Sequence, residues 1–146
     1  MFHTKNENEL IAIGQKLGSL LDKGHVLILT GDLGAGKTTL TKGIAKGLGI
    51  TQMIKSPTYT IVREYEGRVP LYHLDVYRIG DDPSSIDLDE FLYGDGVVVI
   101  EWGELLTGLP ADYLSVRLSH EEEGRSIAFT ATGQQSRALL EDFEND

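Results

Sequence analysis

The feature that most constrains the fold is a glycine-rich segment between an apolar run and a helix-like stretch. Residues 31–38 read Gly-Asp-Leu-Gly-Ala-Gly-Lys-Thr and match G-x-x-x-x-G-K-[ST] at every fixed position. The preceding residues, 26–30, form an apolar run typical of a strand buried on both faces of a parallel sheet. Residues 39–48 read as a helix that ends at Gly49. Strand, loop and helix in this order are the context that a phosphate-binding loop, or P-loop, requires.

The residue types of this segment suit phosphate chemistry. Glycines at Gly31, Gly34 and Gly36 let the backbone adopt positive φ and point its amides inward as an anion site at a helix N-terminus. Lys37 is expected to reach the β and γ phosphates, and Thr38 to offer its hydroxyl to Mg²⁺. The alternative is a chance glycine turn before a helix, which the flanking strand and helix disfavour.

Two carboxylates are candidates for the metal and the attacking water. Glu101 ends the apolar run 97–100, the usual position of a Walker-B acid, and a strand end beside the P-loop lies near the γ-phosphate. The alternative for Glu101 is a solvated strand terminus. Asp75 closes the strand-like segment 71–75. From the residues alone, Asp75 is equally consistent with an ordinary capping or salt-bridge aspartate.

The rest of the chain alternates helical and strand-like patterns. Thr4 and Glu7 have the spacing of a capping box before an amphipathic helix that ends near Gly24. The other expected elements are, in chain order, a hairpin of 58–65 and 69–76, a short helix over 82–92, a strand over 97–100, two antiparallel strands over 113–119 and 125–132, and a terminal helix over 136–143. These patterns predict an α/β fold.

Length, composition and net charge limit the kinds of protein that this chain can be. The 146 residues, 40% of them hydrophobic, can bury the core of one domain, and we expect a single domain over residues 1–146. The sequence shows neither a secretory signal nor a membrane-length apolar run, and without cysteine it suits a reducing compartment. We therefore expect a cytoplasmic protein with no membrane association. A formal net charge of -10 opposes autonomous binding to nucleic acid.

Some residues carry weaker signals. Residues 56–60, Ser-Pro-Thr-Tyr-Thr, suit either a nucleotide-sensing loop or a turn that enters a strand. His73 fits a packed strand residue better than a ligand, and Trp102 suits either the core or a cover over the site. Arg78 and Arg125 could contact a phosphate or a base, although most isolated arginines are solvated or paired.

Four motifs together resemble one family. They are the P-loop at 31–39, Ser-Pro-Thr-Tyr-Thr at 56–60, Leu-Tyr-His-Leu-Asp-Val-Tyr-Arg at 71–78 and Glu-Trp at 101–102. In this order and spacing, the motifs resemble the TsaE family, also called YjeE, an ATPase that assists bacterial threonylcarbamoyladenosine formation on tRNA. The resemblance implies a P-loop domain with a mixed central sheet flanked by helices. It also implies that the protein joins the TsaB and TsaD proteins, meets tRNA only through that complex, and leaves the transfer chemistry to TsaD.

The resemblance also implies roles for individual positions. The catalytic residues would be Lys37, Asp75 and Glu101, and Mg²⁺ would be held by Thr38 and Glu101. The residues implied to bind ATP are Thr4, Gly31, Asp32, Leu33, Gly34, Ala35, Gly36, Lys37, Thr38, Thr39 and Arg125. Those implied in the switch-like loop or a partner contact are Ser56, Thr58, Tyr59 and Trp102. Relatives vary after Trp102, so no role is carried past it in that segment.

Three other functions compete. A small-molecule kinase would share the P-loop but usually needs an arginine-bearing lid, and the sequence has no basic insertion of that kind. A GTPase would need Asn-Lys-x-Asp and Asp-x-x-Gly motifs, which the sequence lacks. A nucleotide-sensing adaptor would bind ATP without needing to turn it over. Stimulation of ATP hydrolysis by TsaB and TsaD distinguishes an ATPase from that adaptor.

Overall fold

The computed structural model describes residues 2–31, 36–51, 62–75, 95–101 and 111–145. Within these ranges the elements are β1 (Phe2–Thr4), α1 (Glu7–Leu20), β2 (Val26–Gly31), α2 (Lys37–Gly47), β3 (Val62–Tyr65), β4 (Leu71–Asp75), β5 (Val97–Glu101), β6 (Leu114–Glu121), β7 (Gly124–Ala131) and α4 (Gln134–Asn145). Apart from β1, which no sequence pattern predicted, the elements within these ranges follow one another in the predicted order.

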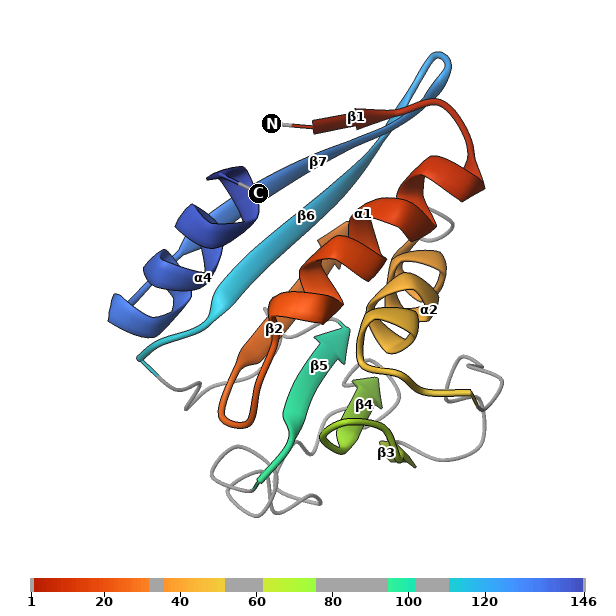
Figure 1. The fold of residues 1–146 in the computed structure, drawn as a ribbon. Helices are drawn as coiled ribbons and strands as arrows, with labels where there is room; N and C mark the ends of the chain where they lie inside the picture. The colour runs from red at the N-terminus through yellow and green to blue at the C-terminus, as the bar shows by residue number, and fades with distance from the viewer. Residues whose placement is uncertain (1, 32–35, 52–61, 76–94, 102–110, 146) are drawn as a thin grey trace, which may run out of the picture.

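The strands form one sheet in the order β1-β7-β6-β2-β5-β4-β3. The four central strands, β6, β2, β5 and β4, run parallel to one another. The outer strands β7, β1 and β3 pair antiparallel with their neighbours. The fold is therefore α/β with a mixed sheet, which confirms the expectation (Figure 1).

The burial of each strand follows from its place in the sheet. In the central strands β2 and β5, residues 26–29 and 97–100 are all buried, as expected where both faces are covered. Strand β6 instead alternates, with Leu114, Val116 and Leu118 buried and Arg117 exposed between them. The core therefore lies on the face of the sheet that α1 and α2 cover (Figure 1).

Helices α1 and α2 pack with their backbones in contact. A Cβ added at Gly18 of α1 would lie 2.2 Å from the carbonyl oxygen of Ile44, and one added at Gly43 of α2 would lie 2.3 Å from that of Ile11. Real Cβ atoms do not approach backbone so closely, so a side chain at either glycine would force the helices apart. The glycines thus fix the position of α2 against α1.

No helix within the described ranges is long and apolar enough to cross a membrane.

An aromatic cluster joins the N-terminal strand to the C-terminal helix. The ring centroids of Phe2, Phe129 and Phe143 lie 5.2–5.6 Å apart, the usual spacing of edge-to-face and tilted aromatic pairs. The Nζ atom of Lys16 in α1 lies 4.7 Å from the centroid of the Phe143 ring. The first two elements of the chain, β1 and α1, and the last two, β7 and α4, are therefore held together at one edge of the molecule.

The start of α1 differs from the prediction. Asn6, not Thr4, caps the helix: its side-chain oxygen accepts a hydrogen bond from the backbone N–H of Glu9 at 2.9 Å. The Glu9 carboxylate in turn accepts from the backbone N–H of Lys5 at 2.9 Å. Thr4 cannot cap α1 because it lies in β1, where it pairs with Arg125 of β7. The predicted capping box at Thr4 is therefore wrong, because the prediction rested only on the spacing of Thr4 and Glu7 and not on the pairing of β1 with β7.

The other predicted elements agree with the structure to within a few residues. The hairpin is present as the antiparallel pair of β3 and β4, and the C-terminal strand pair and helix are present as β6, β7 and α4. The short helix predicted over 82–92 lies outside the described residues.

Candidate functional site

The described part of the P-loop includes the N-terminus of α2. Gly36 is the N-cap of α2 with φ +106°, and no side-chain hydrogen bond caps the helix there. The first turn of α2 contains no acidic residue. The positive φ favours glycine at this position, whereas a Cβ there would meet only the movable end of the Leu10 side chain, Cδ2 at 2.7 Å. The backbone amides of this first turn form a site suited to an anion.

Lys37 bridges the two ends of the loop. Its side chain is buried, and Nζ donates a hydrogen bond to the carbonyl oxygen of Gly31 at 2.7 Å. The hydroxyl of Thr41, one turn later, donates to the carbonyl oxygen of Lys37 at 2.9 Å. Thr38 and Thr39 follow Lys37 and are half-buried. The ammonium group is thus held at the start of α2, where it can supply positive charge to a phosphate.

Glu101 lies on β5, the strand that pairs with β2, and β2 leads into the P-loop. The register pairs Glu101 with Leu29 of β2, two residues before Gly31. Its side chain is 6% exposed, and Oε2 lies 2.5 Å from Nε2 of His73, whose side chain is 0% exposed. Glu101 is therefore a buried carboxylate at the edge where the parallel strands end, not a solvated strand terminus.

The sequence did not predict the contact between His73 and Glu101. His73 is a packed strand residue, as expected, but its Nε2 also forms a hydrogen bond with Glu101, the candidate metal ligand. The signal that could have found it is the strand pairing of β4 with β5, which places His73 opposite Val99. Asp75 pairs with Glu101 in the same backbone register.

The donor set suits Mg²⁺. The hydroxyl of Thr38 and the carboxylate of Glu101 are hard oxygen donors of the kind that Mg²⁺ prefers. No group of three or more His, Cys, Asp or Glu side chains forms a metal cage in the described part of the chain. A pair of protein oxygens completed by phosphate and water is the usual arrangement for Mg²⁺ at a nucleotide site.

A pocket adjoins the start of α2. This pocket of about 240 Å³ is built from the β1–α1 junction, the start of α2 and the turn between β6 and β7. Its lining residues are Thr4, Lys5, Asn6, Glu7, Leu10, Gly36, Thr39, Gly124 and Arg125. Gly36 belongs to both this pocket and the P-loop, so a ligand whose phosphates lie at α2 can extend into the pocket.

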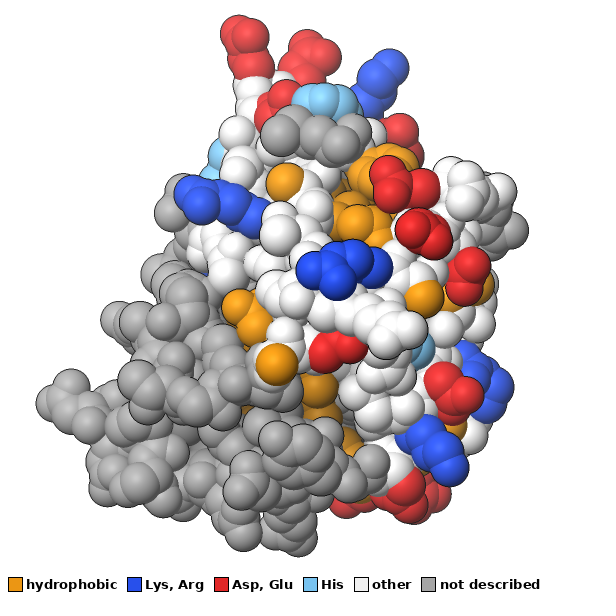
Figure 2. Space-filling model, turned by 90° about the vertical axis from the view of Figure 1, so that its left-hand side faces the viewer, with side chains coloured by type: hydrophobic (Ala, Val, Ile, Leu, Met, Phe, Trp, Pro, Cys, Tyr) orange, Lys and Arg blue, Asp and Glu red, His pale blue; other side chains and the backbone are white. Residues whose placement is uncertain are grey.

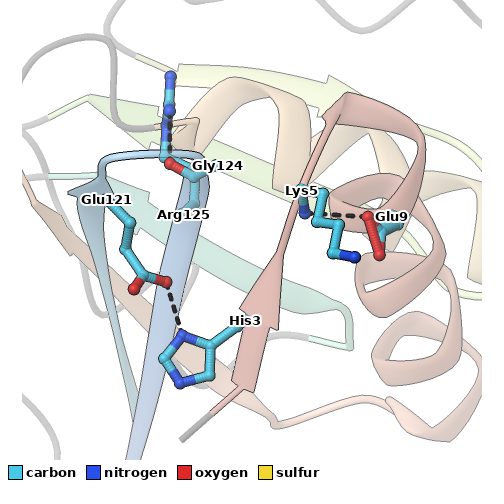
Figure 3. Close-up of polar contacts among 6 residues, drawn as sticks. All are labelled: His3, Lys5, Glu9, Glu121, Gly124 and Arg125. Atoms are coloured by element: carbon cyan, nitrogen blue, oxygen red, sulfur yellow. Dashed lines mark hydrogen bonds and ion pairs between the residues drawn. The ribbon is translucent and has the colours of Figure 1, made fainter.

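The walls of the pocket carry polar groups. Thr4 is 2% exposed, and its hydroxyl is buried without a hydrogen-bond partner among the described residues. Arg125 donates from Nη1 to the carbonyl oxygen of Gly124 at 2.7 Å (Figure 3). A buried hydroxyl of this kind usually has a partner, and a bound nucleoside could supply one.

Close packing at the turn between β6 and β7 holds the pocket together. Gly124 has φ +102°, and a Cβ there would lie 1.7 Å from the carbonyl oxygen of Thr4. Beside it, Nδ1 of His3 and Oε1 of Glu121 lie 2.6 Å apart (Figure 3). The turn itself is acidic: residues 121–123 are all glutamate and exposed, and acidic side chains project at that end of the molecule in Figure 2. The acidic tip opposes contact with a phosphate backbone.

The remaining predicted site positions fall outside the described residues. They are Asp32, Leu33, Gly34, Ala35, Ser56, Thr58, Tyr59, Arg78 and Trp102. Their roles stay predictions.

Comparisons with known proteins agree on one family. The family described as "Threonylcarbamoyl adenosine biosynthesis protein TsaE" matches residues 4–127. A relative from Bacillus subtilis (strain 168), named tRNA threonylcarbamoyladenosine biosynthesis protein TsaE, is 44% identical over 145 residues, covering 97% of this chain and 92% of the relative. A relative of the same name from Nostoc sp. is 45% identical over 125 residues, covering 82% of this chain and 77% of the relative. The crystal structure of Bacillus subtilis YdiB matches with a TM-score of 0.88 and 41% identity, covering 99% of this chain and 93% of that one.

Proposed function

Because the chain belongs to the TsaE family, we propose that it is a Mg²⁺-dependent ATPase that supports threonylcarbamoyladenosine modification of tRNA. The reaction is ATP plus water to ADP plus phosphate. The observation that carries the proposal is the buried side chain of Lys37 at the N-terminus of α2, with the buried carboxylate of Glu101 on the strand next to β2.

In this proposal each residue has a distinct role. The α2 amides and Lys37 bind the phosphates and stabilise the charge that develops as the γ-phosphate departs. Thr38 and Glu101 would hold Mg²⁺. When bound, Mg²⁺ neutralises phosphate charge and polarises the phosphoryl oxygens. Asp75 is proposed to orient the attacking water or to sense the γ-phosphate.

The proposed nucleoside position is the pocket beside Gly36. Thr4 and Arg125 line it from two paired strands, and the hydroxyl of Thr4 can donate to or accept from a base or ribose. A volume of about 240 Å³ is of the order expected for part of a small-ligand site, with the phosphates lying outside it at α2. In this proposal ATP lies across the junction of α1, α2 and the β6–β7 turn.

The proposed partners are the TsaB and TsaD proteins, with tRNA reached only through them. A net charge of -10 leaves few places where the isolated chain can replace condensed counterions. We expect little tRNA affinity from the purified chain. The rival function is a nucleotide-sensing adaptor, whose output would be binding without turnover.

The test separates the two carboxylates and the two functions. Hydrolysis of ATP should be slow for the chain alone and should rise when TsaB and TsaD are added. In Glu101→Gln, we expect loss of both hydrolysis and the Mg²⁺ dependence of ADP affinity. In Asp75→Asn, ADP affinity should persist while hydrolysis falls by about a hundredfold.

Two results would change this proposal. If Asp75→Asn loses the Mg²⁺ dependence and Glu101→Gln retains it, the two roles are reversed. If nucleotide binds but no hydrolysis is detected with or without TsaB and TsaD, the adaptor is the better description.

A further inference from the structure

His73 and Glu101 are two of only a few buried polar side chains in the described ranges. The others are Thr4, Lys37, Thr41 and Ser136. Burying an imidazole and a carboxylate costs free energy unless each is hydrogen-bonded. An apolar residue at position 73 would fill the strand at a lower cost, so packing alone does not explain a histidine there.

Strand pairing puts the two side chains on one face of the sheet. His73 lies opposite Val99, and Glu101 is the next residue along β5 on the face of Val99. This is the face that carries Leu27 and Leu29 of β2 towards the core beneath α1 and α2. The contact therefore spans neighbouring strands directly beside the strand that leads into the P-loop.

The contacts of the two ring nitrogens of His73 indicate which of them carries the hydrogen that lies between His73 and Glu101. A separation of 2.5 Å between Nε2 of His73 and Oε2 of Glu101 requires a hydrogen bond. The other ring nitrogen, Nδ1, is buried and has no hydrogen-bond partner among the described residues. A hydrogen on Nδ1 would be an orphaned buried donor, which is more costly than an unpaired acceptor in this setting. The favoured arrangement has Nε2–H of His73 donating to the carboxylate of Glu101.

We propose that His73 is a positioning residue that holds Oε2 of Glu101, so that Oε1 is oriented for the metal. The proposal rests on the function above, in which Glu101 is a ligand of Mg²⁺. A metal-ligating carboxylate needs a partner for its other oxygen, and losing such a partner typically weakens metal affinity or activity by about 10–100-fold. His73 acts through Glu101 and need not touch nucleotide or metal.

The test compares three variants in β4. His73→Leu fills the site without a donor. His73→Gln keeps an amide N–H donor on a side chain of similar reach. Leu71→Val alters packing on the same face of the same strand, at a fully buried position without a polar group, and serves as the matched control. Thermal unfolding of each variant verifies that the protein tested is folded.

The readout is ADP affinity measured by calorimetry with Mg²⁺ and with EDTA. We expect His73→Leu to weaken Mg²⁺-ADP binding by about 10–100-fold and to leave affinity in EDTA unchanged. His73→Gln should recover most of the loss, and Leu71→Val should match the wild type. Equal losses with Mg²⁺ and with EDTA, or wild-type affinity in a folded His73→Leu, would overturn the positioning role.

A measurement on the wild type removes dependence on how the variants fold. Long-range ¹⁵N–¹H correlation spectra should show the ring hydrogen of His73 on Nε2, and a bare Nε2 would contradict the proposed hydrogen bond. The failures are also distinguishable. If wild-type ADP affinity shows no Mg²⁺ dependence, the proposed role of Glu101 as a Mg²⁺ ligand is wrong; if the dependence is present and His73→Leu keeps it, only the role of His73 is wrong.

Discussion

The two ends of the proposed nucleotide site are built in different ways. The phosphate end comes from one stretch of chain, in which Lys37 of α2 bonds back to Gly31 of β2, six residues earlier. The nucleoside end joins segments more than a hundred residues apart, since Thr4 of β1 pairs with Arg125 of β7. The first end depends on the charge of one side chain, whereas the second depends on how closely separate segments pack. Substitutions should therefore affect the chemistry at one end and the shape of the site at the other.

The largest effect is expected from removing the charge at the phosphate end. Lys37→Ala should lower ATP hydrolysis by about 10²–10³-fold, because a positioned cation is lost from the transferring phosphoryl group. The matched control is Lys42→Ala, the same substitution at an exposed position of α2. Steady-state hydrolysis of both variants tests the prediction. Undiminished activity in Lys37→Ala would point to a contaminating ATPase or a different site.

An intermediate effect is expected from changing the shape of the nucleoside end. At Gly124, φ is +102° and a Cβ would lie 1.7 Å from the carbonyl oxygen of Thr4, so alanine there must displace β1. We expect Gly124→Ala to weaken ADP binding by about tenfold, a loss of about 1.4 kcal/mol. It should also lower the free energy of unfolding by about 1–3 kcal/mol.

Gly49 supplies the control for backbone strain. It has φ +77°, but a Cβ there would have no neighbour within 4 Å. Gly49→Ala should lower the free energy of unfolding by about 1–2 kcal/mol through strain alone and leave ADP affinity unchanged. Denaturant unfolding and ADP titration of both variants measure the difference. Equal ADP affinity in the two variants would mean that the packing of β1 on the turn does not shape the pocket.

The smallest effect concerns α4, which packs against β6, β7 and α1 and contributes no residue to the pocket. The Asp112 carboxylate accepts hydrogen bonds from the backbone N–H groups of Gln135 at 2.7 Å and Ser136 at 2.9 Å, in the first turn of α4. Asp112→Ala should lower the free energy of unfolding by about 1 kcal/mol, the usual scale for a lost helix cap. The control, Asp142→Ala, removes an exposed carboxylate near the other end of α4 and should be neutral or slightly stabilising.

This contribution should depend on pH. Desolvation on its own would raise the pKa of Asp112, but hydrogen bonds from Ser136 and Gln135 and the charge of Arg137 outweigh it and lower the pKa below 3.8. A carboxyl group whose pKa is lower in the folded state stabilises the fold above its unfolded pKa and loses that effect as pH falls through the folded value. The difference between wild type and Asp112→Ala should be complete at pH 7 and shrink below pH 3.8. A constant difference across that range would exclude the carboxylate as its cause.

The sequence predictions succeeded where the interactions join residues close in the sequence and failed where they join distant segments. Apolar runs predicted the buried strands β2 and β5, and helical spacing predicted α1, because both patterns reflect burial of neighbouring residues. The capping prediction failed at Thr4, since pairing with β7 extends the chain there and the cap passes to Asn6. The same pairing brings Thr4 into the pocket with Arg125, an arrangement that only the resemblance to a family had suggested.

By itself, the sequence predicted the order of the elements other than β1, and it identified the P-loop, because a contiguous motif between a strand and a helix is recognisable from local pattern alone. Only the tertiary structure decided that His73 meets Glu101, and that the β1–α1 junction, α2 and the β6–β7 turn share one pocket. The physical reason is that these contacts cross between strands or between distant segments. Their formation depends on strand order and register, which local spacing does not encode.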